Sequence, residues 1–435
     1  MPLIFFVTVL LLLLMGFPVA FTLGGASVIF GAATFGLDFF NLLPLRIWGT
    51  MNNYILMAVP LFIFMGVMFE KSGLAEELLE TMALLFGKLR GGLAISVLVV
   101  GAMLAAATGI VGATVVTIGV LSLPTMLKKG YSPEVASGII SASGTLGQII
   151  PPSIVLVLLG SILNISVGDL FMAAVIPGII LVLLYLLWLI FLAVTKPEST
   201  PAMPKEELRD FVGTEKFKRV INAFLIPFIL ILAVLGSIFA GIASPTEAAA
   251  IGAMGATVLT MFRKKFDLAT LKEVALRTTS LTSMAFLILV GASAFGLVFR
   301  GMHGDRYLIE LITSGGIEAH HFLIIVMVII FIAGFFIDFI EITFIIVPVV
   351  APIFVQLNLD LLWIGILIAI NLQTSFLTPP FGFSLFYLKG VAPPEVTTKH
   401  IYRGIIPYVA IQLLVLLIII IFPDIALYLP KLITG

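Results

Sequence analysis

Two stretches of sequence decide the fold: Gly144–Ser153, which reads GTLGQIIPPS, and Asn371–Gly382, which reads NLQTSFLTPPFG. Each stretch places a Pro-Pro pair inside an apolar segment. Proline lacks a backbone N–H and clashes with the preceding helical turn, so a helix that reaches either pair must break there. The two pairs begin at positions 151 and 379, an offset of 228 residues, which indicates that the second half of the chain repeats the first.

Other prolines support the repeat. Three further pairs align close to the same offset: Pro18 with Pro245, Pro124 with Pro352, and Pro177 with Pro407. Side-chain identity between the halves is otherwise slight, so the repeated feature is the position of helix breaks. Chance among 23 prolines is the alternative, but several matches in the same order are hard to produce at random.

The composition indicates which solvent the chain occupies. The chain has 435 residues, of which 61% are hydrophobic and 11% are charged, and its mean hydropathy is +1.25. A soluble protein is nearer half apolar and a quarter charged, so we predict a polytopic membrane protein with the lipid bilayer as its partner. Lys+Arg and Asp+Glu balance at 23 each, which removes the electrostatic case for nucleic acid as a partner. Cysteine is absent, which excludes disulfides, thiolate catalysis and Cys-ligated metals.

Basic residues orient the segments in the membrane. The positive-inside rule assigns to the cytoplasm the basic regions 71–90, 128–129, 196–219, 263–277 and 389–403. Because both ends of 91–127 then lie on the cytoplasmic side, this segment is predicted to enter and leave by one face, with a turn near Thr108–Gly112. The second half runs in the opposite sense, and 321–355 is expected to be the matching hairpin that opens to the outside.

We therefore predict an all-α polytopic membrane protein with two inverted-topology repeats, about ten to twelve transmembrane helices, two re-entrant hairpins and two broken helices. In the first repeat, 1–194, the expected elements are scaffold helices 3–37 with a break near Gly16 and Pro18, an arm 51–90, a hairpin 91–127, a broken helix 133–165 and a helix 171–194. A cytoplasmic linker, 195–220, leads to the second repeat, 221–435. Its expected elements are scaffold helices 221–262, an arm 279–316, a hairpin 321–355, a broken helix 360–388 and a helix 404–422.

Inverted repeats with interrupted helices are the architecture of secondary transporters. Non-helical backbone inside a bilayer leaves N–H and C=O groups unpaired, and it is tolerated only where it lines a site or is covered by protein. Freed carbonyls can bind Na⁺, and helix N-termini can face an anion. The hairpin tips Thr108–Thr114 and Gly334–Thr343, together with the two Pro-Pro stretches, therefore predict a transport site.

Polar side chains near these segments are candidates to line the site: Thr108, Thr114, Thr145, Asp338, Glu341 and Arg300. Each threonine hydroxyl could instead be bonded back to its own helix. The two acids lie one turn apart and share a helical face. A charge at membrane depth costs at least about 2.5–3.5 kcal/mol, so a partner, an ion or a proton is expected unless the pair is hydrated and structural. The arginine ends a predicted outward helix, where it could meet a substrate carboxylate or anchor the helix at the interface.

Several rival functions lack the motifs that they need. The chain has no G-x-x-x-x-G-K-[ST] sequence for an ATP-driven pump, and its four histidines form no His-Glu-x-x-His zinc motif. The segment Gly291–Ala294 superficially suits an intramembrane serine protease, but His320 and His321 begin a hairpin at the interface. A channel would need a continuous pathway lined by polar residues, and the low number of charged residues does not indicate one. We therefore expect a transporter and no enzymatic activity.

The same segments resemble the large membrane subunit (M type, DctM-like) of the tripartite ATP-independent periplasmic (TRAP) transporters, within the ion-transporter superfamily of elevator carriers. The matching stretches are Pro60–Gly66, Ser72–Glu76, Gly91–Ala94, Gly144–Gly147, Pro151–Ser153, Ser244–Ala250 and Thr378–Gly382, and they cover nearly the whole chain. The run Ser244–Ala250, SPTEAAA, is the most specific of them. One departure is the first hairpin tip, which is richer in serine in many relatives than TGIVGAT is here.

The resemblance implies a mechanism and partners. It implies sodium-coupled uptake of an organic acid across a bacterial or archaeal inner (cytoplasmic) membrane, with Na⁺ as coupling ion and no organic cofactor. It also implies a small four-helix membrane subunit (Q type) and a periplasmic substrate-binding protein (P type). A stand-alone sodium–carboxylate symporter of the same superfamily is the alternative, because architecture alone does not separate the two.

The resemblance also implies ion-site residues. The second sodium site would fall on Gly334, Ser375, Thr378 and Phe381, largely through carbonyls. By the repeat, the first would fall on Ala106, Gly147, Ile150 and Ser153.

Overall fold

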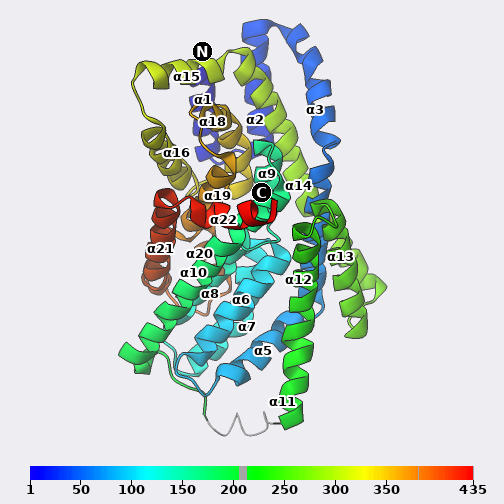
Figure 1. Ribbon diagram of the computed structural model, residues 1–435, viewed down its shortest axis with the longest axis vertical. Helices are drawn as coiled ribbons and strands as arrows, with labels where there is room; N and C mark the ends of the chain where they lie inside the picture. Colours follow the sequence, from blue (N-terminus) through cyan, green and yellow to red (C-terminus); the bar gives the residue numbers. More distant parts are fainter. Residues whose placement is uncertain (205–212, 381, 435) are drawn as a thin grey trace.

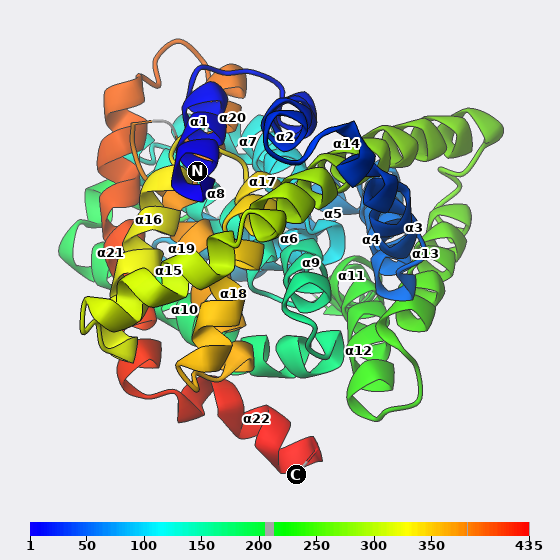
Figure 2. The ribbon, with the colours of Figure 1, turned by 90° about the horizontal axis from the view of Figure 1, so that it is seen from above.

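The structure, a computed structural model, describes residues 1–204, 213–380 and 382–434. All regular structure in these ranges is helical (Figures 1 and 2). The helices of the first half are α1 (Pro2–Leu14), α2 (Val19–Phe35), α3 (Leu43–Met51), α4 (Ala58–Lys71), α5 (Leu74–Phe86), α6 (Gly92–Thr108), α7 (Val111–Lys128), α8 (Pro133–Thr145), α9 (Ile154–Leu163) and α10 (Val167–Thr195). Those of the second half are α11 (Gly213–Val220), α12 (Ile226–Phe239), α13 (Pro245–Phe262), α14 (Leu268–Gly301), α15 (Gly304–Ser314), α16 (Ala319–Ala333), α17 (Phe339–Ile345), α18 (Val347–Gln356), α19 (Leu361–Leu377), α20 (Phe383–Val391), α21 (Thr398–Ile421) and α22 (Asp424–Thr434).

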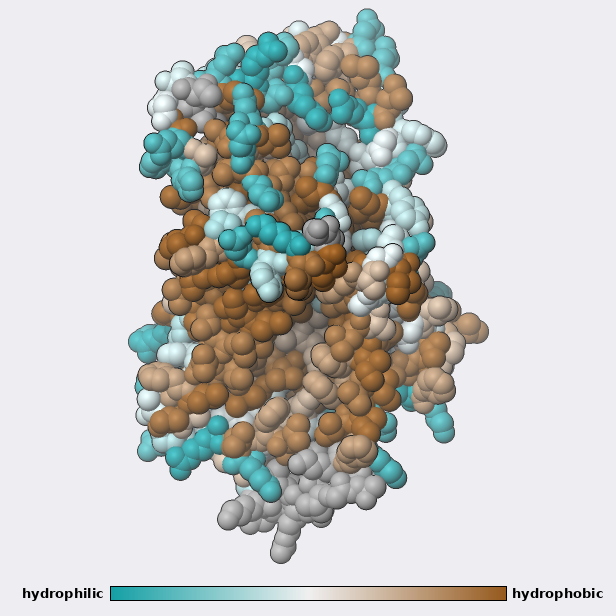
Figure 3. Space-filling model, in the orientation of Figure 1, coloured by the Kyte–Doolittle hydropathy of each residue, from teal (hydrophilic) through white to brown (hydrophobic). Residues whose placement is uncertain are grey.

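Many of these helices have the length and the apolar composition of membrane-spanning helices. Within the described residues, 6 are long and apolar enough to cross a membrane, or up to 7 if the bent pair α17–α18 is one span. Shorter apolar helices of 10–17 residues accompany them. Large apolar side chains such as Ile179, Leu183 and Leu187 on α10 are exposed, and hydrophobic residues cover much of the face in Figure 3. The predicted all-α polytopic membrane protein is confirmed, and the total of ten to twelve spans stays a prediction.

Both Pro-Pro stretches break their helices, as the sequence predicts. In the first half α8 ends at Thr145, a 3₁₀ turn covers Leu146–Gln148, and α9 starts at Ile154. In the second half α19 ends at Leu377 and α20 starts at Phe383. Both Pro-Pro peptide bonds are cis.

Each predicted hairpin is a pair of helices joined by a short turn. Gly109 and Ile110 join α6 to α7, and the turn lies within the predicted interval. The second hairpin turns between α16 and α17, after Gly334, and its outgoing limb is bent by 50° between α17 and α18. The hairpins therefore present two backbone turns, one from each half of the chain.

Several boundaries differ from the sequence-based expectation. The predicted linker 195–220 is helical from Gly213 onward, because α11 continues through a π-helical turn into α12. The helix expected from 279 starts at Leu268, because Asp267 caps it by accepting a hydrogen bond from the Thr270 N–H at 2.6 Å. This hydrogen bond also lowers the pKa of the Asp267 carboxyl. The C-terminal helix α22 was not expected.

The scaffold helices of each half pack against the long arm helix of the other half. Helix α13 lies on α4, and its Thr246 hydroxyl donates to the carbonyl of Tyr54, in the 3₁₀ turn just before α4, at 3.1 Å. Helix α2 lies on α14, where a Cβ added to Gly291 would come within 2.6 Å of the Ala20 carbonyl oxygen. The halves are therefore interlocked along their arms.

Helix α8 forms the centre of the other packing region, with α6, α7 and α21 around it. Its crossing with α21 depends on two glycines. A Cβ on Gly138 would overlap the Gly404 backbone, and a Cβ on Gly404 would overlap the Glu134 carbonyl. The two backbones therefore meet directly, as in small-residue crossings of membrane helices.

Replacing Gly138 by Leu should force α8 and α21 apart, at a cost of about 1–3 kcal/mol for overpacking. We expect a lower midpoint of thermal unfolding for the purified protein. Gly236→Leu in α12 is the matched control, because nothing lies within 4 Å of a Cβ at that position. Equal midpoints for the two variants would contradict the close crossing.

Candidate functional site

The two hairpin tips meet at one cavity of about 350 Å³. The first tip contributes Gly109–Ala113 and the second contributes Asp338–Ile340. The arm helices α4 and α14 form another part of the wall, and Ile154 and Phe376 come from the two broken helices. Cavities of this size hold small organic molecules. The segments that the sequence singles out therefore converge on one space.

The first tip is held by its own polar groups. Gly109 adopts the left-handed conformation, with φ +61, which reverses the chain after α6. Beyond it, the Ile110 N–H donates to the Thr108 hydroxyl at 3.4 Å. The Thr108 and Thr114 hydroxyls are hydrogen-bonded to each other at 2.8 Å, and the Thr114 hydroxyl also donates to the Ile110 carbonyl at 3.0 Å. A Cβ on Gly109 would lie 3.0 Å from Ile154, so the turn also packs against the start of α9. The two threonines brace the tip.

The second tip is held by a capping box. Asp338 is the N-cap of α17, and its carboxylate accepts a hydrogen bond from the Phe339 N–H at 2.5 Å. The Glu341 carboxylate reaches back to the Asp338 N–H at 3.2 Å. Acids at these positions satisfy free N–H groups and the positive end of the helix dipole. The capping box supplies the partner that the sequence led us to expect for these two acids.

The structure brings together most of the second set of proposed ion ligands. A Cβ on Gly334 would overlap the Ser375 side chain, so the hairpin and α19 touch there. The Thr378 N–H donates to the Ser375 carbonyl at 3.1 Å, and the Thr378 hydroxyl donates to the Thr374 carbonyl at 2.7 Å. Phe381 lies outside the described residues.

The first set is arranged in a similar way. A Cβ on Gly147 would come within 2.5 Å of the Ala105 carbonyl oxygen, beside Ala106 near the end of α6. The Ile150 N–H donates to the Leu146 carbonyl at 2.8 Å, and the Ser153 hydroxyl donates to the Gln148 carbonyl at 2.7 Å. In each half a hairpin helix thus meets the broken helix of the same half.

Of the six candidates from the sequence, only Asp338 lines this cavity. Thr108, Thr114 and Glu341 brace the two tips without lining it, and the remaining two lie farther away. The buried Thr145 hydroxyl donates to the Ala142 carbonyl at 2.8 Å, which is bonding back to its own helix. Arg300 ends α14 about 35 Å from Arg277, at 1.5 Å per residue. It lines a separate cavity of about 670 Å³, with Arg46 in the same wall.

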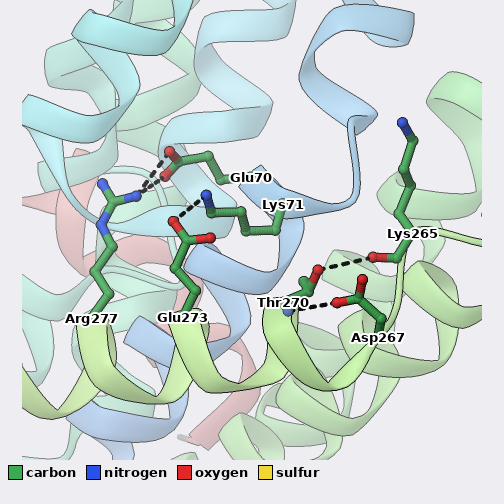
Figure 4. Close-up of polar contacts among 7 residues, drawn as sticks. All are labelled: Glu70, Lys71, Lys265, Asp267, Thr270, Glu273 and Arg277. Atoms are coloured by element: carbon green, nitrogen blue, oxygen red, sulfur yellow. Dashed lines mark hydrogen bonds and ion pairs between the residues drawn. The ribbon is translucent and has the colours of Figure 1, made fainter.

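The cavity wall also holds an ion pair that the sequence interpretation missed. Arg277 of α14 donates from one guanidinium nitrogen to both carboxylate oxygens of Glu70 on α4, at 2.9 and 3.0 Å (Figure 4). Both residues line the cavity. A second ion pair, Lys71 with Glu273, lies beside it without lining the cavity. A charge inside a long apolar helix was the available signal, but the expected helix start at 279 left Arg277 in a cytoplasmic loop.

A helical membrane protein whose hairpins and broken helices surround one cavity belongs to the class of membrane transport proteins. Residues 6–425 match the model of the family described as "Tripartite ATP-independent periplasmic transporter, DctM component". The chain belongs to this family. It is therefore the large permease of a TRAP transporter, an inner-membrane protein and not an enzyme.

Individual relatives agree with the family match. The chain is 31% identical, over 91% of both chains, to the C4-dicarboxylate TRAP transporter large permease protein DctM of Pseudomonas aeruginosa. It is 28% identical to the isethionate TRAP transporter permease protein DctMQ of Oleidesulfovibrio alaskensis, over 96% of this chain and 64% of that protein. Among solved structures, the YdaH transporter of Alcanivorax borkumensis shares the fold, with a TM-score of 0.63 and 14% identity over 95% of this chain and 97% of that one.

The capping role of Asp338 can be separated from its charge. Asparagine caps helices about as well as aspartate, whereas alanine does not, and losing a cap costs about 0.5–2 kcal/mol. We expect Asp338→Ala to lower the midpoint of thermal unfolding and Asp338→Asn to leave it unchanged, with transport retained in the second variant. A stable Asp338→Asn protein without transport would show that the charge itself is required.

Proposed function

We propose that this permease carries an organic anion from a periplasmic binding protein into the cell, driven by an inward sodium gradient, with the anion bound in the cavity between the hairpin tips. The observation that supports this proposal most directly is the convergence of both tips and both broken helices on that cavity. Sodium ions would be bound as cargo at the helix breaks beside it.

The positions of the prolines support the ion sites. In a continuous helix the N–H of each residue donates to the carbonyl four residues earlier. Pro151 and Pro379 have no N–H, so the carbonyls of Gly147 and Ser375 lose their regular donors. These are the residues that contact the hairpins. The Ser375 carbonyl accepts the Thr378 N–H at 3.1 Å, and its second lone pair, like the Gly147 carbonyl, is suited to a hard cation such as Na⁺.

The packing supports two inverted repeats and an elevator motion. The contact of α13 with α4 corresponds, across the repeat, to the contact of α2 with α14. We infer that hairpins and broken helices move as one unit against a frame of α1, α2, α12 and α13. The joints of the arms have left-handed residues, Gly73 with φ +70 between α4 and α5 and His303 with φ +57 between α14 and α15.

The family supports the partners and the substrate class. Its description names a tripartite periplasmic transporter, which implies a binding protein and a small membrane subunit beside this permease. One relative is named for C4-dicarboxylates and another for isethionate, which are different organic anions. We infer that the binding protein selects the compound and that the permease accepts its acid group. A stand-alone symporter is the second candidate, and it would transport without any binding protein.

The central experiment is uptake into proteoliposomes that contain this permease and its small membrane subunit, with the binding protein and labelled anion outside. Net movement of one positive charge through about 150 mV supplies roughly 3.5 kcal/mol. At about 1.4 kcal/mol per decade, that supports accumulation of two to three decades. We expect uptake to stop when choline replaces sodium, without any need for ATP. Unchanged uptake in choline would refute sodium coupling, and uptake without binding protein would favour the stand-alone symporter.

Replacing Thr378 by Val keeps side-chain volume and branching and removes the hydroxyl at the second break. If this hydroxyl is one ligand of a carbonyl-rich ion site, sodium affinity should fall by about 1–2 kcal/mol, roughly five- to thirtyfold in the sodium dependence of uptake. Thr145→Val is the control, because both hydroxyls donate to a carbonyl of their own helix and Thr145 is not among the proposed ion ligands. Unaltered sodium dependence in Thr378→Val, with loss in Thr145→Val, would overturn the assignment.

A further inference from the structure

The tip cavity has an uneven distribution of charge. Among the described residues that line it, Glu70 and Asp338 are acidic and Arg277 is the one cation. The Asp338 carboxylate is occupied at the N-terminus of α17. Most of the remaining wall is apolar, including Leu281 and Met284 on the same helix as the arginine. An anion in this cavity therefore has a single basic side chain to meet.

The Glu70 ion pair leaves most of that guanidinium free. Both carboxylate oxygens bond to the same nitrogen, Nη1, at 2.9 and 3.0 Å. Within the described part of the chain, Nε and Nη2 of Arg277 have no protein acceptor. The Arg277 side chain is 36% exposed and that of Glu70 is 23% exposed, and both residues line the cavity. Two parallel N–H groups on one edge of a guanidinium match the two oxygens of a carboxylate or sulfonate.

We propose that Arg277 binds one acid group of the transported anion through Nε and Nη2, and that Glu70 positions the guanidinium by holding Nη1. The inference rests on the proposed function, because it assumes that an organic anion enters the tip cavity. It adds a specific group to that function: an arm helix, which belongs to neither hairpin, recognises the acid. Because α4 supplies Glu70 and α14 supplies Arg277, the arms of both halves contribute to the proposed site.

The neighbouring pair, Lys71 with Glu273, is a natural control. It joins the same two helices one turn away, and neither residue lines the cavity. A variant of Glu273 therefore removes an ion pair between the arms without touching the proposed site. Glu70→Gln removes the negative charge of the cavity pair and keeps Arg277, so the contributions of the acid and of the arginine to binding can be measured separately.

The test is binding of labelled anion, in sodium, to the permease with its small membrane subunit in lipid nanodiscs. Succinate, isethionate and sialic acid serve as probes, and the one that binds tightest is carried forward with its neutral amide analogue. We expect wild-type protein to prefer the acid to the amide by at least about tenfold, the scale of one charge-assisted bidentate contact. Arg277→Gln and Arg277→Lys should weaken acid binding by about tenfold or more, and Arg277→Gln should abolish the preference for the acid. Glu70→Gln should stay within about threefold of wild type, and Glu273→Gln should match wild type.

The outcomes distinguish the inference from the proposed function. Equal losses in Arg277→Gln and Glu70→Gln would show that the pair only joins the arms, and would overturn the inference. So would an Arg277→Gln protein that still prefers the acid. No saturable binding of any of the three anions to wild-type protein would contradict the anion class on which both ideas depend. Sodium-independent uptake by the wild-type complex would refute the coupling and leave the role of Arg277 standing.

Discussion

The structure depends on one constraint, which is that broken backbone in apolar surroundings must be covered. The Pro-Pro pairs remove the regular helical donors to the Gly147 and Ser375 carbonyls, and unpaired backbone groups are costly to leave in lipid. Each break is covered by a hairpin from its own half. Hairpin and break approach closely because a glycine without a Cβ lies at each contact. Gly147 packs against the Ala105 backbone, and Gly334 packs against the Ser375 side chain. The hairpin tips sit beside the breaks for this reason, and a cavity is enclosed where the tips from the two halves meet.

The tips keep their shape with their own hydrogen bonds. Thr108 and Thr114 close a ring with the backbone of Ile110, and Asp338 and Glu341 close a capping box. Neither arrangement needs a ligand, so both turns are preorganised around the cavity. Preorganised groups lose little freedom on binding, which favours a site that must accept and release its occupant repeatedly.

Charged residues within this apolar protein mark where its halves touch. Glu70 with Arg277, Lys71 with Glu273, and Glu77 with Arg263 each join the first half to the second. Ion pairs with this much exposure contribute about 0–1 kcal/mol each. Their structural weight is therefore small beside the packing of α13 on α4 and α2 on α14, and their importance lies in where they place charge. Of these three pairs, Glu70 with Arg277 is the one that lines the cavity between the hairpin tips.

The sequence by itself determined the solvent, the class of structure and the points at which helices end. Apolar composition requires a membrane, and proline and glycine act locally. The first break and the turn after Thr108 therefore lie within the predicted intervals. The second break is shorter than predicted, because α19 stays helical to Leu377, just before the Pro-Pro pair. The tertiary structure decided which of these points meet. Capping by Asp267 extended α14 toward its N-terminus and brought Arg277 into the wall opposite Glu70, a pairing between residues 207 apart in sequence. The tertiary structure also places Arg300 at the far end of α14, away from the cavity, and makes Asp338 the N-cap of α17. The physical reason is that helix breaks depend on one residue and its neighbours, whereas a site depends on how long helices cross, and crossing is fixed by packing over the whole chain.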